Sequence, residues 1–278
     1  MRVDDVSAPQ TIAEAVAVLK RQPGALPWAG GTLILTSRGS DGAPVSVLDL
    51  GRIPELRAVS RSDRYLELGA CVRLATIQAL PGSLALQPLR DAIGLVGTAT
   101  VRNLATLGGN VASRDSFMTC FPSLACMDAT VELRDASGSR WTGIHSLVDG
   151  SGRPAFPAAT LLTRIRIPTA PWDAFALHRL GEPTKGDAFA STFAAAARFE
   201  KETISELRLI ASGRTLARDR ALELSLIGKR LPLTVKDVEE AQEAAREQAI
   251  EAGFPARLAE RFGAYVMSFL ANVQEGGR

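Results

Sequence analysis

The sequence predicts an α+β protein with two lobes followed by a C-terminal domain of antiparallel strands and helices. Segments with helical spacing of apolar residues alternate with segments in which apolar residues recur at every second position. The stretch Thr169-Ala170-Pro171-Trp172 has the composition of a hinge, and strand-like patterns dominate directly after it. We therefore expect lobes at residues 1–55 and 56–170 and the C-terminal domain at residues 171–278.

The first lobe is expected to hold one helix and two strands. Apolar residues recur at helical spacing within residues 11–21, and Pro23-Gly24 ends that helix. Strands are expected at residues 25–29 and 45–50, whereas residues 33–37 fit a helix or an extended segment.

The same spacing patterns predict helices and strands in the second lobe and in the C-terminal domain. The second lobe should contain helices at residues 75–80, 89–94 and 123–128, and strands at residues 65–69, 130–134, 140–142 and 161–168. The C-terminal domain should contain strands at residues 175–180, 189–199 and 204–211, and helices at residues 216–227, 235–252 and 258–273. Four consecutive alanines, residues 194–197, also fit a helix.

Composition excludes several classes of function. The 278 residues are 46% hydrophobic and 22% charged, with a net charge of +2 and no strongly basic stretch, so neither nucleic acid nor a membrane surface is an expected partner. No run of about 18 apolar residues predicts a membrane span. The N-terminus lacks the apolar core of a signal peptide, and we expect a cytoplasmic protein.

Cysteines and histidines do not suggest a metal centre. Cys71, Cys120 and Cys126 are odd in number and form no CxxC pair, so we expect buried free thiols. His145 and His178 lack metal-ligand spacing.

Two diglycine segments about eighty residues apart are the strongest functional signal. The first is Ala29-Gly30-Gly31-Thr32, and the second is Thr106-Leu107-Gly108-Gly109-Asn110. Glycine reaches positive φ and lets other groups approach the main chain. The pattern therefore predicts two cradles of main-chain N–H groups around one anionic ligand, for which a diphosphate is suitable. The alternative is a pair of ordinary tight turns.

The second diglycine segment also belongs to a longer motif. Residues 101–112, VRNLATLGGNVA, and residues 121–133, FPSLACMDATVEL, closely resemble a signature of the FAD-binding subunits of molybdenum hydroxylases. That family includes the medium subunits of aerobic carbon monoxide dehydrogenases and of bacterial xanthine and aldehyde dehydrogenases. The first diglycine segment and residues 161–168 and 227–229 also match, so the resemblance extends over essentially the whole chain.

The resemblance implies a fold and a set of FAD contacts. It implies a two-lobed PCMH-type FAD-binding domain, followed by a C-terminal domain of the carbon monoxide dehydrogenase flavoprotein type. Main-chain N–H groups of the glycines should bind the diphosphate, and Arg179 should place a cation near the flavin. Arg102 and Asn103 are expected to shape the second segment rather than touch the ligand. The implied cofactor-binding residues are Ala29, Gly30, Gly31, Thr32, Leu33, Val96, Thr106, Leu107, Gly108, Gly109, Asn110, Asp115, Thr119, Leu162 and Arg179.

Some positions depart from the family pattern. Leu33 replaces a polar residue after the first segment, and Thr119 stands where relatives usually place an aspartate, with Asp115 nearby as the candidate to substitute for it. Each loss removes a hydrogen bond worth about 0.5–1.5 kcal/mol.

The resemblance also implies a function without catalytic or metal-ligating residues in this chain. Electrons would pass from the molybdenum cofactor of a large subunit, through iron–sulfur clusters of a small subunit, to FAD and on to NAD, a quinone, oxygen or a ferredoxin. Many relatives form dimers of heterotrimers. Two alternatives stay open, namely an assembly subunit that binds FAD weakly or not at all and a stand-alone flavin oxidoreductase.

Overall fold

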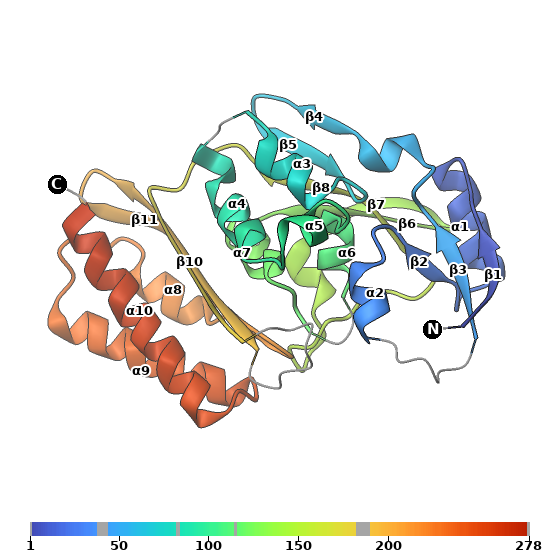
Figure 1. The fold of residues 1–278 in the computed structure, drawn as a ribbon. Coiled ribbons are helices and arrows are strands. Elements are labelled where there is room, and N and C mark those ends of the chain that lie inside the picture. The colour runs from blue at the N-terminus through green and yellow to red at the C-terminus, as the bar shows by residue number, and fades with distance from the viewer. Residues whose placement is uncertain (1, 38–43, 82–83, 114–115, 182–189, 277–278) are drawn as a thin grey trace.

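The computed structural model describes residues 2–37, 44–81, 84–113, 116–181 and 190–276, whose strands form three sheets (Figure 1). The sheets follow one another along the chain, and the two termini lie at opposite ends of the molecule (Figure 1). The mixture of helices and sheets confirms the α+β prediction.

The first sheet is parallel, in the order β1-β3-β2. It consists of β1 (Val3–Ser7), β2 (Leu26–Trp28) and β3 (Val45–Asp49), with α1 (Ile12–Arg21) between the first two strands and α2 (Thr32–Ser37) after β2. The Thr11 hydroxyl accepts a hydrogen bond from the N–H of Glu14 at 3.2 Å, which fixes the start of α1. The sequence patterns do not predict β1, because its residues VDDVS carry two adjacent carboxylates.

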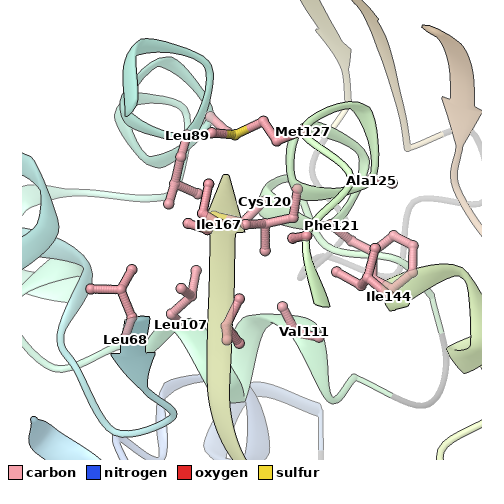
Figure 2. Packing of buried hydrophobic residues seen from close by; sticks show 14 of the residues in the cluster. Leu68, Leu89, Leu107, Val111, Cys120, Phe121, Ala125, Met127, Ile144 and Ile167 are labelled. Carbon is pink, nitrogen blue, oxygen red and sulfur yellow. The ribbon is translucent and has the colours of Figure 1, made fainter. Parts of the chain in front are cut away.

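The second sheet is antiparallel, in the order β4-β5-β8-β6-β7. Its strands are β4 (Val59–Arg61), β5 (Tyr65–Gly69), β6 (Thr130–Asp135), β7 (Gly138–Gly143) and β8 (Leu161–Pro168). Short helices accompany it: α3 (Leu74–Ala79), α4 (Gln87–Gly94), α5 (Ala99–Arg102), α6 (Leu107–Val111) and α7 (Cys120–Cys126). Single 3₁₀ turns occupy Pro54–Arg57, Leu84–Leu86 and Ile144–Leu147. Leu68, Leu107, Phe121 and Ile167 pack together in the core between this sheet and its helices (Figure 2).

The third sheet is antiparallel, in the order β12-β11-β10-β9. Its strands are β9 (Ala174–Leu180), β10 (Ser191–Glu200), β11 (Thr203–Ser212) and β12 (Leu216–Ala217). The helices α8 (Arg220–Leu226), α9 (Val235–Glu251) and α10 (Ala256–Gly276) follow it. Figure 1 shows α9 and α10 beside one face of this sheet, while α7 packs against β10 and β11.

The alanine run of β10 is a strand, so the helical alternative was wrong. Ala194 and Ala196 belong to the core around the second sheet, whereas Ala195 and Ala197 belong to the core under the C-terminal helices. Alternate residues of a strand face opposite sides, and here both sides are buried. Small side chains let both layers approach the same strand.

Other segments differ from the sequence prediction at their edges. Residues 216–217 form β12, so the helix expected at residues 216–227 begins only at Arg220, where Asp219 accepts hydrogen bonds from the N–H groups of Ala221 and Leu222. Helix α7 begins at Cys120 and not at residue 123. All three cysteines are free and buried, as expected. Within the described segments, none of the helices combines the length and the hydropathy that a membrane crossing requires.

Candidate functional site

The two glycine segments, residues 29–32 and 106–110, line one cavity of about 590 Å³. Its walls come from the first sheet and α2, from the helices of the second sheet, from the start of β8, and from β9 of the third sheet. Most of the lining is apolar, with main-chain groups, threonine hydroxyls and the Arg179 side chain among the polar groups. A cavity of this size and character suits a small molecule or a cofactor.

The first glycine segment has a conformation that only glycine tolerates well. Gly31 has φ of +69°, and a Cβ added there would overlap the indole ring of Trp28. A Cβ on Gly30 would overlap the carbonyl oxygen of Leu104, so this segment touches the chain just before the second segment. Within the described part of the chain, the N–H groups of Gly30 and Gly31 have no acceptor. These two donors are available to a ligand in the cavity.

The second glycine segment is built differently, as the first residues of helix α6. The N–H groups of residues 107–110 are already hydrogen bonded: Leu107 donates to the carbonyl of Val72, Gly108 to that of Ala70, Asn110 to that of Thr106, and Gly109 to the Thr106 hydroxyl at 3.1 Å. The N–H groups of residues 107–110 are therefore not the open donors that the sequence led us to expect, because the helix cap and the turn after β5 accept their hydrogen bonds. None of these glycines needs positive φ.

Close packing explains Gly108. A Cβ there would lie 2.6 Å from the Cβ of Ala70 and 2.7 Å from its carbonyl oxygen. At Gly109 the nearest atom would be the Thr106 hydroxyl oxygen at 3.0 Å, and Gly109 lines the cavity. Gly108 is thus required for close packing in the core, whereas Gly109 borders the cavity.

The cavity lining brings together most of the residues that the sequence singled out. Ala29, Gly30, Gly31, Thr32 and Leu33 line it between β2 and α2, together with Thr106, Gly108, Gly109, Asn110 and Thr119 around the helices of the second sheet. Val96, Leu162 and Arg179 complete the predicted set that faces the cavity. Asp115 lies outside the described residues.

Leu107 does not line the cavity, contrary to its inclusion among the cofactor contacts. Its side chain is fully buried and lies in the core with Leu68 and Ile167 (Figure 2). The helical conformation of α6 turns Leu107 away from the side on which Gly109 and Asn110 border the cavity.

Polar contacts at the back of the cavity hold α6 and α7 together. The Asn110 side-chain oxygen accepts a hydrogen bond from the N–H of Cys120 at 3.1 Å. Thr119, which precedes Cys120, is only 3% exposed. The Asn110 side chain therefore holds the first residue of α7. The sequence pattern did not predict this structural role.

The sequence patterns did not single out several of the residues that line the cavity. They are Pro27, Ile34, Leu50, Ala70, Cys71, Leu95, Gly97, Thr98, Val101, Ala105, Ala112, Met118, Phe156, Thr160 and Leu161. Burial raises the pKa of the Cys71 thiol to about 12, with Arg57 acting in the opposite direction, so this thiol stays protonated and unreactive at neutral pH. Leu161 could have been found from the resemblance, as the neighbour of Leu162 in β8. Phe156 lies in an irregular segment that no periodic pattern marks.

Comparison with known proteins agrees with this architecture. Residues 2–170 match the family described as the FAD binding domain in molybdopterin dehydrogenase. The chain is 31% identical over 173 residues to the carbon monoxide dehydrogenase medium chain of Afipia carboxidovorans, covering 60% of this chain and 59% of that one. It is 28% identical over 167 residues to the nicotinate dehydrogenase FAD-subunit of Eubacterium barkeri, covering 58% and 56%. The matched region spans less than two thirds of either relative.

A solved structure extends the similarity to the whole fold. It is a carbon monoxide dehydrogenase from Hydrogenophaga pseudoflava which lacks the Mo-pyranopterin moiety of the molybdenum cofactor. The TM-score is 0.84 at 25% identity, and the alignment covers 99% of this chain and 98% of that one. With the family match over more than half of its residues, this chain belongs to the family of FAD binding domains of molybdopterin dehydrogenases.

Proposed function

We propose that this chain is the FAD-binding electron-transfer subunit of a multi-subunit molybdenum hydroxylase. One observation carries the proposal: two glycine segments distant in sequence border a single cavity of about 590 Å³ in a chain of this family. The proposed lobes at residues 1–55 and 56–170 and the C-terminal domain at residues 171–278 each contain one of the three sheets.

The residues present fit a dinucleotide with a diphosphate bridge. The N–H groups of Gly30 and Gly31 are donors without an acceptor among the described residues, and glycine at both positions keeps side chains away from them. Thr106 and Asn110 add polar side chains on the opposite wall, and Val96 and Leu162 offer apolar surface for an aromatic ring. Hydrogen-bond donors beside an apolar cavity are what an anionic bridge between aromatic groups requires.

When bound, FAD accepts electrons singly and releases them in pairs, and the protein supplies only position and electrostatics. Arg179 brings a guanidinium to the cavity wall, where positive charge favours negative charge on a nearby group. No acid, base or nucleophile is required of this chain, and the protonated Cys71 thiol agrees with that role.

The proposed partners are a large subunit with a molybdenum cofactor and a small subunit with iron–sulfur clusters. The names of relatives as a medium chain and an FAD-subunit support this assignment. We further propose a dimer of heterotrimers, a cytoplasmic location, and NAD or another external electron acceptor.

The test begins with the absorption spectrum of the purified chain. Flavin bands that survive gel filtration, together with copurification of molybdenum and iron–sulfur subunits from the native host, are expected. A featureless visible spectrum after incubation with FAD would favour the alternative of an assembly subunit. Two observations favour that alternative. The cavity wall has Leu33 and Thr119 at positions where relatives usually have other polar or acidic residues, and the N–H groups of residues 107–110 are already hydrogen bonded within the protein. Isolation of the chain alone, with flavin and a bound organic substrate, would favour a stand-alone oxidoreductase.

A further inference from the structure

One wall of the cavity is a short backbone link between α4 and α5, residues 95–98. All four of its residues line the cavity, and the link turns at Gly97, whose φ is +45°. A Cβ at Gly97 would lie 3.1 Å from the side chain of Val101. The conformation of this wall is thus unusual, and the wall lacks a sheet or a long helix to stabilise it.

Arginines satisfy every carbonyl group of this link. Arg102 Nη1 donates to the carbonyl of Val96 at 3.0 Å and to that of Gly97 at 2.9 Å, and the N–H of Arg102 donates to the carbonyl of Thr98. Arg179 Nη1 donates to the carbonyl of Leu95. The last carbonyls of a helix have no partner within it, and positive charge is favourable there.

The two arginines come from different parts of the molecule. Arg102 is the last residue of α5 and is itself oriented by the side chain of Gln78, which accepts a hydrogen bond from Arg102 Nε at 3.1 Å. Arg179 lies in β9, an edge strand of the third sheet. The contact from Arg179 therefore joins the cavity wall to the C-terminal part of the chain.

We propose that Arg102 and Arg179 clamp the backbone of residues 95–97 and, as positioning residues, couple the shape of the cofactor cavity to docking of the third sheet. The proposal rests on the proposed function, since it assigns the clamped wall to an FAD cavity. Charge-assisted hydrogen bonds from two sides hold the wall where the cofactor needs it. Loss of either arginine lets residues 95–98 move before any cofactor binds.

The first experiment needs no cofactor. Amide hydrogen exchange of the peptide over residues 93–101 is measured in the full chain without FAD, for wild type and for Arg102→Gln and Arg179→Gln. Both variants should exchange at least about fivefold faster in this peptide, since the wall opens more often. Unchanged exchange in both variants overturns the clamp, whatever the chain binds.

The second experiment is an FAD titration of the same proteins. Each single variant should bind FAD about five- to tenfold more weakly. The double variant should lose less than the product of the two single losses, because the two arginines act on one segment. Multiplicative losses would contradict a shared clamp. If wild type binds no FAD, the proposed function fails while the exchange result still decides the clamp.

Conservative and control variants separate positioning from general stability. Lysine can replace the bond from Arg179 to Leu95, so Arg179→Lys should recover much of the affinity. Arg102→Lys should recover less, because lysine lacks the Nε–H that donates to Gln78 and orients the side chain toward the carbonyls of Val96 and Gly97. Arg198→Gln is the matched control. Arg198 also lies in the third sheet and donates to main-chain carbonyls outside it, those of Ala170 and Pro171, but not to the cavity wall. Its loss should leave exchange at residues 93–101 and FAD affinity unchanged, and an equal effect would overturn the proposal.

Discussion

The two glycine segments share a dipeptide, yet their glycines solve different physical problems. In the first segment Gly31 adopts positive φ, and the N–H groups of Gly30 and Gly31 remain available. In the second segment Gly108 and Gly109 are helical, and their N–H groups are already bonded within the protein. A diglycine pair therefore indicates close approach to the main chain, but it does not indicate which groups approach.

The largest expected effect comes from the packed glycine of the second segment. Gly108→Ala forces a Cβ against Ala70 at 2.6 Å in the core and should lower the free energy of unfolding by about 3 kcal/mol. Urea denaturation of the chain without FAD measures it. Gly109→Ala is the matched control, since its Cβ meets only the Thr106 hydroxyl, and it should stay within about 1 kcal/mol of wild type. Equal losses of unfolding free energy in the two variants would contradict the conclusion that only Gly108 is required for packing in the core.

Unfolding free energies of these variants are best compared near neutral pH, because protonation of His145 changes the stability of the chain at lower pH. Burial, followed by the charge of Arg218, lowers the pKa of His145 to about 4, and Arg218 Nη1 donates to its Nε2 at 2.8 Å. The unfolded chain therefore binds more protons than the folded chain between about pH 6.5 and 4. The free energy of unfolding should be highest above this window and fall by up to about 3 kcal/mol as the pH drops through it.

Removing the imidazole tests the origin of that slope. His145→Gln should flatten the dependence of the unfolding free energy on pH between about pH 6.5 and 4. Parallel profiles for variant and wild type would mean that other groups cause it.

The strained glycine of the first segment should affect the ligand more than the fold. Gly31→Ala places a side chain at φ of +69°, which alone should cost about 1–2 kcal/mol of unfolding free energy, and the Trp28 ring, which the added Cβ would overlap, must also shift. FAD affinity should fall at least about tenfold, since the available N–H groups move with the backbone. Gly24→Ala, which has no atom within 4 Å of the added Cβ, is the control for losing a glycine. Unchanged FAD affinity in Gly31→Ala would contradict the proposal that the first glycine segment binds FAD.

The smallest expected effect is loss of the helix cap in the second segment. Thr106→Val removes the hydroxyl that accepts from the N–H of Gly109 and should cost about 1 kcal/mol of unfolding free energy. Thr106→Ser keeps the oxygen and should remain near wild type in thermal denaturation. A full loss in the serine variant would assign the effect to the missing methyl group instead.

The fold was largely predictable where one periodic pattern dominated. Helices α1, α9 and α10 and strand β8 follow their apolar spacing closely. The alanines of β10 were ambiguous because a strand buried on both faces has no polar side to reveal its period. Strand β1 carries adjacent carboxylates, so only its pairing with β3 identifies it.

The sequence predicted many of the residues that line the cavity, but not the hydrogen bonds that they make. The glycine motif and the resemblance placed Gly30, Gly31, Gly109 and Asn110 at one cavity. No sequence signal shows that Ala70 and Val72 accept the N–H groups of the second segment, because those contacts depend on the tertiary fold. The arginines that hold residues 95–97 were not predicted either. Arg102 had been expected to shape the second glycine segment, but its side chain donates to Gln78, Val96 and Gly97 instead.

A crystal structure of the full chain with FAD tests the central claim most directly. Diphosphate oxygens should lie within hydrogen-bond distance of the N–H groups of Gly30 and Gly31, while Gly108 and Gly109 keep their hydrogen bonds to Ala70 and Thr106. A diphosphate bound away from the first glycine segment, or FAD outside this cavity, would contradict it.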